Sequence, residues 1–380
     1  MYIHGTKKLL DKVKQHHEVA MADLESGGLF SWHANLIKLR GRQSVLLVND
    51  KSLYVIVLYG LRAKDFSQLD TLIKDAIRTV WFEEGVKEDV IEAYLEQAGE
   101  VFFGKTNDRK FVARMTQACK EAPFYESEME GEDVIQIPHS LRLSWRLVGM
   151  GNSDYFKPAE ALLEELQAFS HGDVLSVRAA EMDVRLMLGE QEVWRRLMVP
   201  LNRTFWQFHE ILQAAFAWWD YHLHSFYLFG NEKLEKPYNV NHPAYTEEGA
   251  KPVVKLVPDE MMMDGPNEGV PVKLEKGVKL SEFLPEIGSL VYVYDFGDDW
   301  RHRIDVLRVV EDSTVNHPVC LDGRGDAPPE DVGGESGYVQ FLEIMNDEEH
   351  PDHTHMKEWL SGQLYQRFDL DLINRMLDSR

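Results

Sequence analysis

The sequence predicts a protein of two α+β domains. Residues 1–170 alternate helical and extended patterns, and residues 171–380 begin with the order strand, strand, helix, strand. The stretch "SHGD" at 170–173 separates the two patterns and gives the domain boundary. A ββαβ start followed by antiparallel strands favours a mixed, mainly antiparallel sheet in the second domain, with helices at its C-terminal end.

The first domain is expected to contain a β-hairpin and several helices. Two runs rich in valine, leucine, isoleucine and tyrosine flank "NDKS" within residues 44–61, and asparagine and aspartate favour a turn between such strands. Gly85 and Gly99 suit the C-terminal ends of two helices, and Asp108 suits the N-cap of a third. The expected helices cover residues 7–24, 65–85, 87–99, 108–122 and 156–169.

The second domain is expected to place two strands before its first helix. These strands cover residues 174–188 and 193–200, and a proline ends the second. Thr204 and Gln207 have the spacing of a capping box, so a helix begins there and continues to residue 218. Later elements are strands at 222–230, 289–296 and 301–310, a short helix at "SEFL", and two or three C-terminal helices.

The charge of the chain is strongly negative and unevenly distributed. The net charge is −23, and residues 171–380 account for −18, from 20 basic and 38 acidic side chains. Nucleic-acid binding depends largely on neutralising phosphates with lysine and arginine, so the charge disfavours it, and a protein partner is expected instead. The acidity is also explained by solubility alone.

The expected location follows from what the sequence lacks. It contains no run approaching the roughly eighteen apolar residues of a membrane-spanning helix, and its start has no signal-peptide pattern. Two cysteines, Cys119 and Cys320, form neither a disulfide framework nor a CxxC metal site. We therefore expect a cytoplasmic protein.

The segment "YVYDFGDDWRH" offers a candidate site with two interpretations. Alternating apolar residues predict two strands around "GDD", and glycine and aspartate suit a tight hairpin whose carboxylates face water. Alternatively, Asp295, Asp298 and Asp299 are oxygen ligands for Mg²⁺ or Mn²⁺, and His302 is a base near neutral pH. Asp295 and Asp298 converge only if the strand bulges at Gly297.

Two further segments carry candidate ligands. In "DYHLHSF", His222 and His224 project from one face of a strand, where two imidazoles can share a metal with a carboxylate. Histidines on a half-buried strand are, however, more often hydrogen-bonded or exposed than bound to a metal. The loop "CLDGRGDAPPEDVGG" is expected to be rigid, and it either lines a site or packs over the sheet. The candidate binding residues are Arg196, Asp220, Tyr294, Trp300, Asp322, Glu330 and Asp331.

A succession of motifs between residues 174 and 378 resembles a known family. "VWRRLMVP", "FHEILQAAFAW", "HLHSF", "YDFGDDWRH", "CLDGRGDAPPEDVGG" and "FDLDLINRML" occur in this order. Together they resemble the Ri-plasmid ORF-three-like family, also described as insertion-element passenger proteins and sometimes labelled resolvase-like. The resemblance implies an α+β domain associated with mobile elements and assigns no activity. A serine recombinase needs a nucleophilic serine among arginines and a basic DNA-binding tail, which a domain at −18 does not suggest.

Residues 1–167 resemble a bacterial domain of unknown function. The resemblance rests on "MYIHGTKKLLDKV", "SWHANLIKLRGRQSVLLVNDKSLYVIVLYGLRAKDF" and "TNDRKFVARM". The conspicuous polar residues of this region are His4, Lys7, His33, Asn35 and Arg109.

Three functions are compatible with these patterns. The first is a binding or regulatory protein with an acidic polar cleft built by the strand of the 220s, the 295–302 hairpin and the 320–334 loop. The second is a metal-dependent hydrolase or nuclease that uses a divalent ion. Its metal ligands would be His222, His224, Asp295 and Asp298, and its catalytic residues would be His302 and Asp299. The third, DNA-site recognition, is disfavoured by charge.

Overall fold

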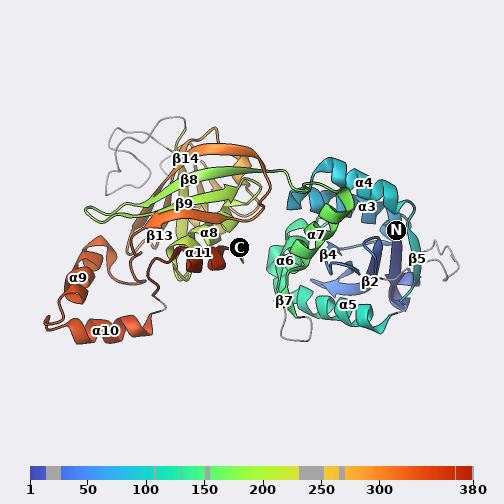
Figure 1. The fold of residues 1–380 in the computed structure, drawn as a ribbon, viewed down its shortest axis with the longest axis horizontal. Helices are drawn as coiled ribbons and strands as arrows, with labels where there is room; N and C mark the ends of the chain where they lie inside the picture. The colour runs from blue at the N-terminus through green and yellow to red at the C-terminus, as the bar shows by residue number, and fades with distance from the viewer. Residues whose placement is uncertain are drawn as a thin grey trace. The chain divides into compact units, whose positions relative to one another are not determined.

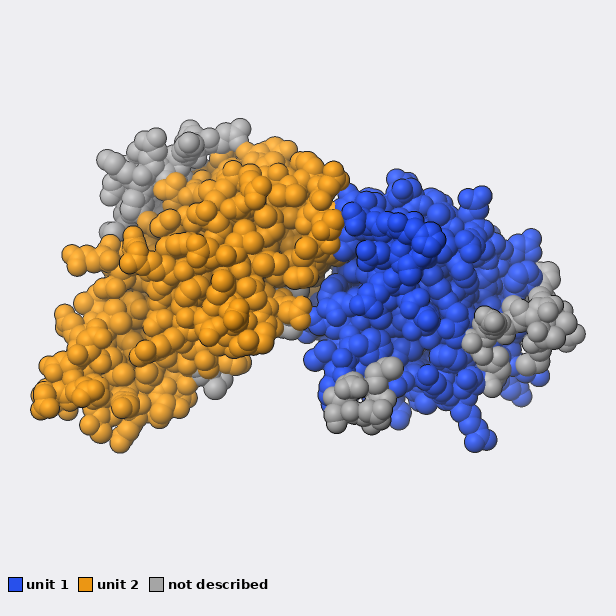
Figure 2. Space-filling view, viewed as in Figure 1, with its two compact units in different colours: residues 1–176 blue, residues 177–380 orange. Residues whose placement is uncertain are grey.

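The computed structural model divides the chain into two compact units, Met1–Ser176 and Val177–Arg380 (Figure 2). It describes residues 1–13, 27–106, 108–129, 131–149, 155–230, 252–264, 270–363 and 365–378. The prediction of two α+β domains is confirmed, because each unit has its own sheet and its own hydrophobic core. Within these ranges every helix is too short or too polar to cross a bilayer.

A five-stranded mixed sheet forms the centre of the first unit, in the order β4–β3–β2–β1–β5 (Figure 1). β1 runs parallel to both neighbours, whereas the β2–β3 and β3–β4 pairs are antiparallel. Because side chains alternate along each strand, one face packs against α3, α4 and α7 and the other against α5, whereas α6 lies along the edge strand β4 and contributes to both cores. The strands are β1 Tyr2–Gly5, β2 Ser31–Leu39, β3 Arg42–Asn49, β4 Val55–Leu58 and β5 Phe102–Lys105, with a short pair β6 Val148–Gly149 and β7 Tyr155–Phe156. The helices are α1 Lys7–Leu10, α2 Ala63–Phe66, α3 Leu69–Glu84, α4 Glu88–Ala98, α5 Arg109–Glu121, α6 Ile137–Trp145 and α7 Pro158–Ser170.

The first unit follows most of its sequence pattern. The predicted hairpin is confirmed as β3 and β4. The helix expected over 65–85 is instead two helices, α2 and α3, separated at residues 67–68. Gly85 ends α3 with a φ of 93°, and the Asp108 carboxylate caps α5. The helix expected over 7–24 is seen as α1 alone, and residues 14–26 lie outside the described part.

An eight-stranded sheet forms the second unit, in the order β12–β11–β10–β13–β14–β8–β9–β15 (Figure 1). The β11–β12 pair is parallel and the other pairs are antiparallel, which confirms the predicted mixed, mainly antiparallel sheet, although β11 and β12 themselves were not predicted. α8 packs its apolar residues on one face of this sheet, and α11 packs on α8 and β15. The strands are β8 Val177–Leu186, β9 Val193–Pro200, β10 His224–Leu228, β11 Val254–Val257, β12 Val272–Leu274, β13 Ser289–Tyr294, β14 Trp300–Ser313 and β15 Val319–Arg324. The helices are α8 Phe205–Phe216, α9 Gly334–Asn346, α10 His353–Gly362 and α11 Leu370–Leu377.

The start of α8 shows how local sequence sets this arrangement. The Thr204 hydroxyl accepts a hydrogen bond from the Gln207 backbone nitrogen at 3.2 Å, and the Gln207 side chain accepts from the Thr204 nitrogen at 2.9 Å. The predicted capping box is therefore confirmed. The predicted ββαβ start is also confirmed, as β8, β9, α8 and β10. The short helix expected at "SEFL" is a 3₁₀ turn, Leu280–Glu282.

Candidate functional site

The hairpin between β13 and β14 is a tight turn at Asp295 and Asp299, whose φ angles are +53° and +59°. The Asp295 Oδ1 accepts two backbone N–H groups of the turn, at 2.8 and 3.2 Å. Asp299 pairs with Arg301 at 2.6 Å. The Asp298 Oδ2 accepts from the Gly333 nitrogen at 3.1 Å, which ties the hairpin to the loop after β15. Asp295 and Asp298 thus serve different partners and do not converge.

Beside this turn, four side chains form a group termed the acidic cluster: His222, Asp295, Glu330 and Asp331. The His222 Nε2 lies 3.1 Å from the Asp331 Oδ1 and 3.5 Å from the Asp295 Oδ2. It lies 4.0 Å from the Glu330 Oε2. This nitrogen is buried and makes no hydrogen bond to any described residue. The 220s segment, the hairpin and the 320–334 loop, expected to build a polar cleft, therefore meet here.

Two residues of the acidic cluster have a strained backbone conformation, and a third is buried. Asp295 and Asp331 have positive φ angles of 53° and 57°, a backbone conformation that residues other than glycine adopt at a cost in free energy. Glu330 is buried and accepts hydrogen bonds from the Trp219 nitrogen and the Tyr294 hydroxyl, both at 3.0 Å. Burial raises the pKa of the Glu330 carboxyl. The described part of the chain provides no lysine or arginine ion pair to these three carboxylates.

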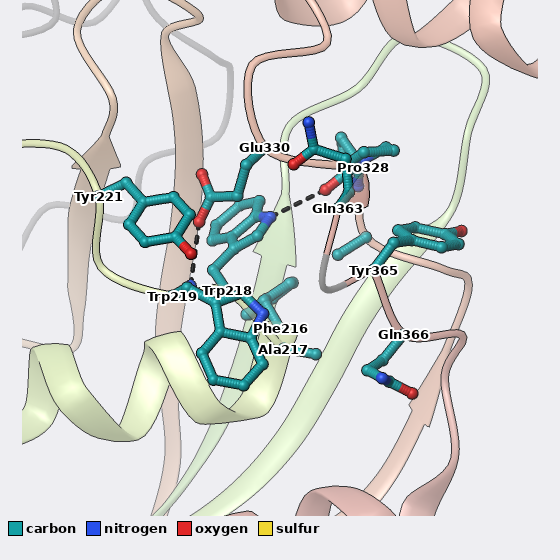
Figure 3. Close-up of a pocket in the computed structure, with 12 residues that line it drawn as sticks. Phe216, Ala217, Trp218, Trp219, Tyr221, Pro328, Glu330, Gln363, Tyr365 and Gln366 are labelled. Carbon is teal, nitrogen blue, oxygen red and sulfur yellow. Dashed lines mark hydrogen bonds between the residues drawn. The ribbon is translucent and has the colours of Figure 1, made fainter. Parts of the chain in front are cut away.

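Glu330 also lies at the edge of an aromatic pocket (Figure 3). Trp219 and Tyr221 are 43% and 60% exposed, so ring surface is available to a ligand. The Trp218 indole donates to the Pro328 carbonyl at 2.9 Å, which fixes the loop that carries Glu330. The other lining residues are Phe216, Ala217, Ala327, Pro329, Gln363, Tyr365 and Gln366. A polar cluster and an aromatic pocket thus share one carboxylate.

A second histidine group lies inside the unit. The rings of His209 and His224 stack face to face, with centroids 3.5 Å apart and planes 4° from parallel. The His209 Nε2 is 2.9 Å from an Asp220 oxygen, and the His224 Nε2 is 2.8 Å from the buried Glu275. An imidazole lone pair lies in the ring plane, so two eclipsed rings cannot direct both Nε2 atoms to one metal ion. Burial lowers the pKa of His209. This group is better explained as a hydrogen-bonded interior pair.

Several residues proposed from the sequence lie outside the acidic cluster. His302 is fully buried against Phe216 and Trp218, and burial lowers its pKa to about 3, so this position does not suit the base that we expected. Trp300 is buried in the core. Arg196 pairs with Asp183 at 3.4 Å. The remaining candidates also have other positions: Asp298 and Asp299 in the turn, His224 in the stacked pair, and Asp322 on β15, where it accepts from the Gly323 nitrogen at 2.8 Å.

Several residues of these sites were not predicted from the sequence. His209 interrupts the apolar face of α8, and two consecutive tryptophans follow that helix, which are signals that could have been used. Glu275 gave no local signal, because it meets His224 across 51 residues of sequence.

Fold and site together define a two-domain α+β protein with an acidic histidine–carboxylate cluster in its second unit. The chain belongs to the family of plasmid pRiA4b ORF-3-like proteins, whose model matches residues 178–376. Residues 2–161 match the model of a domain of unknown function (DUF6933). Both resemblances drawn from the sequence motifs are confirmed.

Two similar proteins have no assigned activity in their names. An uncharacterized protein, y4hQ of Sinorhizobium fredii (strain NBRC 101917 / NGR234), is 33% identical over 178 residues, covering 46% of this chain and 77% of that protein. A crystal structure of the protein of unknown function MM3350 from Methanosarcina mazei Go1 is 27% identical, with a TM-score of 0.40, and the match covers 52% of this chain and 97% of that one.

Proposed function

We propose that the second unit is a binding module that holds a divalent cation at the acidic cluster and a segment of a partner protein in the adjoining aromatic pocket. The proposal is carried by the His222 Nε2, which is buried without a hydrogen bond and has three carboxylate oxygens within 4.0 Å. Carboxylates that share so small a space repel one another. A cation bound by the imidazole and the oxygens would remove that repulsion, and such mixed ligands suit Mn²⁺ or Zn²⁺.

The pocket supports a basic segment as the partner. Its exposed indole and phenol rings present π faces, which attract lysine and arginine side chains. Residues 171–380, which contain the unit, carry a net charge of −18, so its field also favours a basic partner over an acidic one. Nucleic acid is disfavoured by the same field.

Metal analysis tests the cation. The full chain, purified without a chelator or a polyhistidine tag, is expected to hold one equivalent of metal at the acidic cluster or to take it up there from Mg²⁺, Mn²⁺ or Zn²⁺ in calorimetry. The double variant His222→Ala/Asp331→Asn is expected to lose this binding. The matched control, His317→Ala/Asp322→Asn, changes the same residue types outside the cluster and should bind as the parent does. Loss of binding in both variants, or in neither, contradicts the proposal.

Peptide binding tests the pocket. Trp219→Ala is expected to weaken binding of lysine- and arginine-rich peptides by about tenfold, because a cation–π contact contributes about 1 kcal/mol or more. Phe296→Ala, which removes an exposed ring (46%) on the hairpin, is the control. Equal affinity for basic and acidic peptides would contradict the proposal that the partner segment is basic.

A metal-dependent hydrolase is the second candidate, and the position of Glu330 favours it. This carboxylate faces the acidic cluster on one side and the pocket on the other, where a general base for a bound substrate would be needed. Glu330→Gln is expected to abolish any hydrolysis found in phosphatase, esterase and peptidase screens, with metal affinity reduced far less. Activity that survives Glu330→Gln contradicts this role.

A further inference from the structure

Two segments of the second unit contribute to both the acidic cluster and the aromatic pocket. The segment 218–222 lines the pocket with aromatic rings and carries His222 of the cluster. The segment 327–331 lines the pocket with its prolines and carries Asp331 of the cluster. Glu330, in the same segment, belongs to both sites. A ligand at one site is therefore expected to change the affinity of the other.

The Glu330 carboxylate holds the backbone that carries the exposed rings (Figure 3). Its Oε1 accepts a hydrogen bond from the Trp219 nitrogen at 3.0 Å. The same oxygen accepts from the Tyr294 hydroxyl at 3.0 Å, and that hydroxyl in turn accepts from the Tyr221 nitrogen at 3.0 Å. These hydrogen bonds lie within the chain, so the pocket does not depend on an ion for its order.

Glu330 is also the source of negative charge in the pocket. Among the described residues that line the pocket, it is the one with a charged side chain. Ring faces attract lysine and arginine, and a carboxylate next to the rings adds a direct attraction between opposite charges. A basic segment is therefore expected to place a lysine or arginine side chain near Glu330.

An ion in the acidic cluster would lie close to the same carboxylate. The His222 Nε2 is 4.0 Å from the Glu330 Oε2. A bond from a metal ion to an imidazole is about 2.0–2.1 Å long, so an ion on this nitrogen lies within about 6 Å of that oxygen. This separation is shorter than the screening length of about 8 Å at physiological ionic strength. The two positive charges of the ion therefore offset the charge that attracts a basic side chain.

Ordering of the pocket by the ion would act in the opposite direction, but this effect is expected to be smaller. The Trp218 indole donates to the Pro328 carbonyl at 2.9 Å, which joins the two segments without an ion. Trp218 is 4% exposed and Tyr294 is fully buried, so both residues that hold the segments belong to the core. Little conformational freedom remains for an ion to remove, and charge therefore decides the sign of the effect.

We propose that the two ligands of the second unit are antagonists. A divalent cation in the acidic cluster weakens binding of the basic segment in the pocket, and the segment weakens binding of the cation. This antagonism rests on the function proposed above, because it requires both ligands. Coupling between two sites is reciprocal, so both affinities change by the same factor, which we expect to be about tenfold. The unit then binds its partner when divalent ions are scarce and releases it when they are abundant.

Peptide titration of the full chain with and without metal tests the antagonism. The Kd of a lysine- and arginine-rich peptide without histidine or cysteine is measured at constant ionic strength. The first titration uses metal-free buffer, and the second uses a saturating concentration of the ion that the chain takes up, Mg²⁺, Mn²⁺ or Zn²⁺. The peptide Kd should rise about tenfold with the metal, and the metal Kd should rise by the same factor with saturating peptide.

Three variants separate the antagonism from general screening by the added salt. In His222→Ala/Asp331→Asn, which lacks the ion site, the metal should leave the peptide Kd unchanged. The matched control His317→Ala/Asp322→Asn should show the full effect of the metal. Glu330→Gln keeps an acceptor oxygen but loses the charge, so it should bind the peptide more weakly than the parent in metal-free buffer.

The outcomes distinguish this inference from the proposed function. Peptide binding that is unchanged or tighter in saturating metal overturns the antagonism and leaves the proposed function in place. A metal effect as large in His222→Ala/Asp331→Asn as in the parent also overturns it, because salt screening would then be the cause. Absence of metal uptake or of peptide binding contradicts the proposed function and the antagonism together. The main comparison uses the unmutated chain, so it remains valid if a variant fails to fold.

Discussion

At the scale of single residues, burial decides what each histidine can do. His302 sits between aromatic rings, and its pKa falls from 6.5 to about 3. His222 keeps 28% of its side chain exposed and faces carboxylates. The sequence cannot separate the two, because packing across distant segments places His302 of β14 in the core and leaves His222, which precedes β10, partly exposed beside the hairpin.

The buried His302 predicts a specific pH dependence of stability. Its folded pKa, about 3, lies below the unfolded value of 6.5. The unfolded state therefore binds a proton below that value when the folded state does not, and stability falls as pH decreases from 6.5 toward 3. At about pH 5 the free energy of unfolding should drop by about 2 kcal/mol from this residue.

Urea denaturation at a series of pH values measures the effect. The decrease in the free energy of unfolding between pH 6.5 and 3 should become smaller in His302→Leu. It should remain unchanged in His355→Leu, because His355 is exposed on α10. The attribution to His302 is incorrect if the parent and His302→Leu have parallel pH profiles.

Substitution of Arg195 on β9 is expected to cause a large loss of stability. Its guanidinium is buried and donates to the carbonyls of Trp194, Ala215, Arg324 and Gly325 at 2.8–3.0 Å. Arg195→Met removes these donors and leaves buried acceptors unpaired, which should lower the free energy of unfolding by about 3–5 kcal/mol.

Arg178→Met is the matched substitution for this prediction. Arg178 is 46% exposed and pairs with Glu311 at 2.8 Å, so its loss should cost about 1 kcal/mol or less. Chemical denaturation of both variants gives the comparison, and similar losses would show that Arg195 does not act through its buried hydrogen bonds.

At the scale of elements, local sequence was most informative where the signal is short-range. The capping box of α8, the Gly85 terminus of α3 and the ββαβ order follow from neighbouring residues alone. The break between α2 and α3 was missed, because apolar spacing continues through it. The segment 320–334 was expected to be an irregular loop, and this was wrong for its first residues. They belong to β15, which pairs with β9, a strand more than 100 residues earlier in the sequence.

Gly325 tests how closely that loop packs. A Cβ added there would lie 2.2 Å from the Glu192 carbonyl oxygen, and its φ is +78°. Gly325→Ala should therefore destabilise the second unit by about 3 kcal/mol, from backbone strain and overpacking together. It should also weaken metal uptake at the acidic cluster, because the loop carries Glu330 and Asp331.

Gly277 is the control, with a φ of +82° and nothing within 4 Å of the added Cβ. Gly277→Ala should cost only the strain, about 1–2 kcal/mol. Thermal denaturation of both variants distinguishes overpacking from backbone strain. Equal losses of stability in the two variants would mean that backbone strain explains the whole effect.

At the scale of the whole molecule, the sequence predicted the two units but not the contents of the site. Each unit can be recognised from periodicity, because its strands and helices repeat over many residues. The acidic cluster forms where three loops come together. The HxH motif and the turn-like "GDD" motif do not predict that these loops are in contact. Only Asp295 and His222 of the expected metal ligands lie in it, and Glu330 and Asp331 were expected as general binding residues.

Separate cores predict that the second unit folds without the first. Its core is drawn entirely from residues 180–377, and its sheet is complete within it. Residues 177–380 expressed alone should therefore unfold cooperatively, with the near-ultraviolet circular dichroism of packed aromatic rings, and should keep the metal affinity of the acidic cluster. Residues 201–380 lack β8 and β9, which lie between β14 and β15 in the sheet, and should not fold. A fragment 177–380 that stays unfolded, or a fragment 201–380 that folds equally well, would show that the core assignment does not govern folding of this unit.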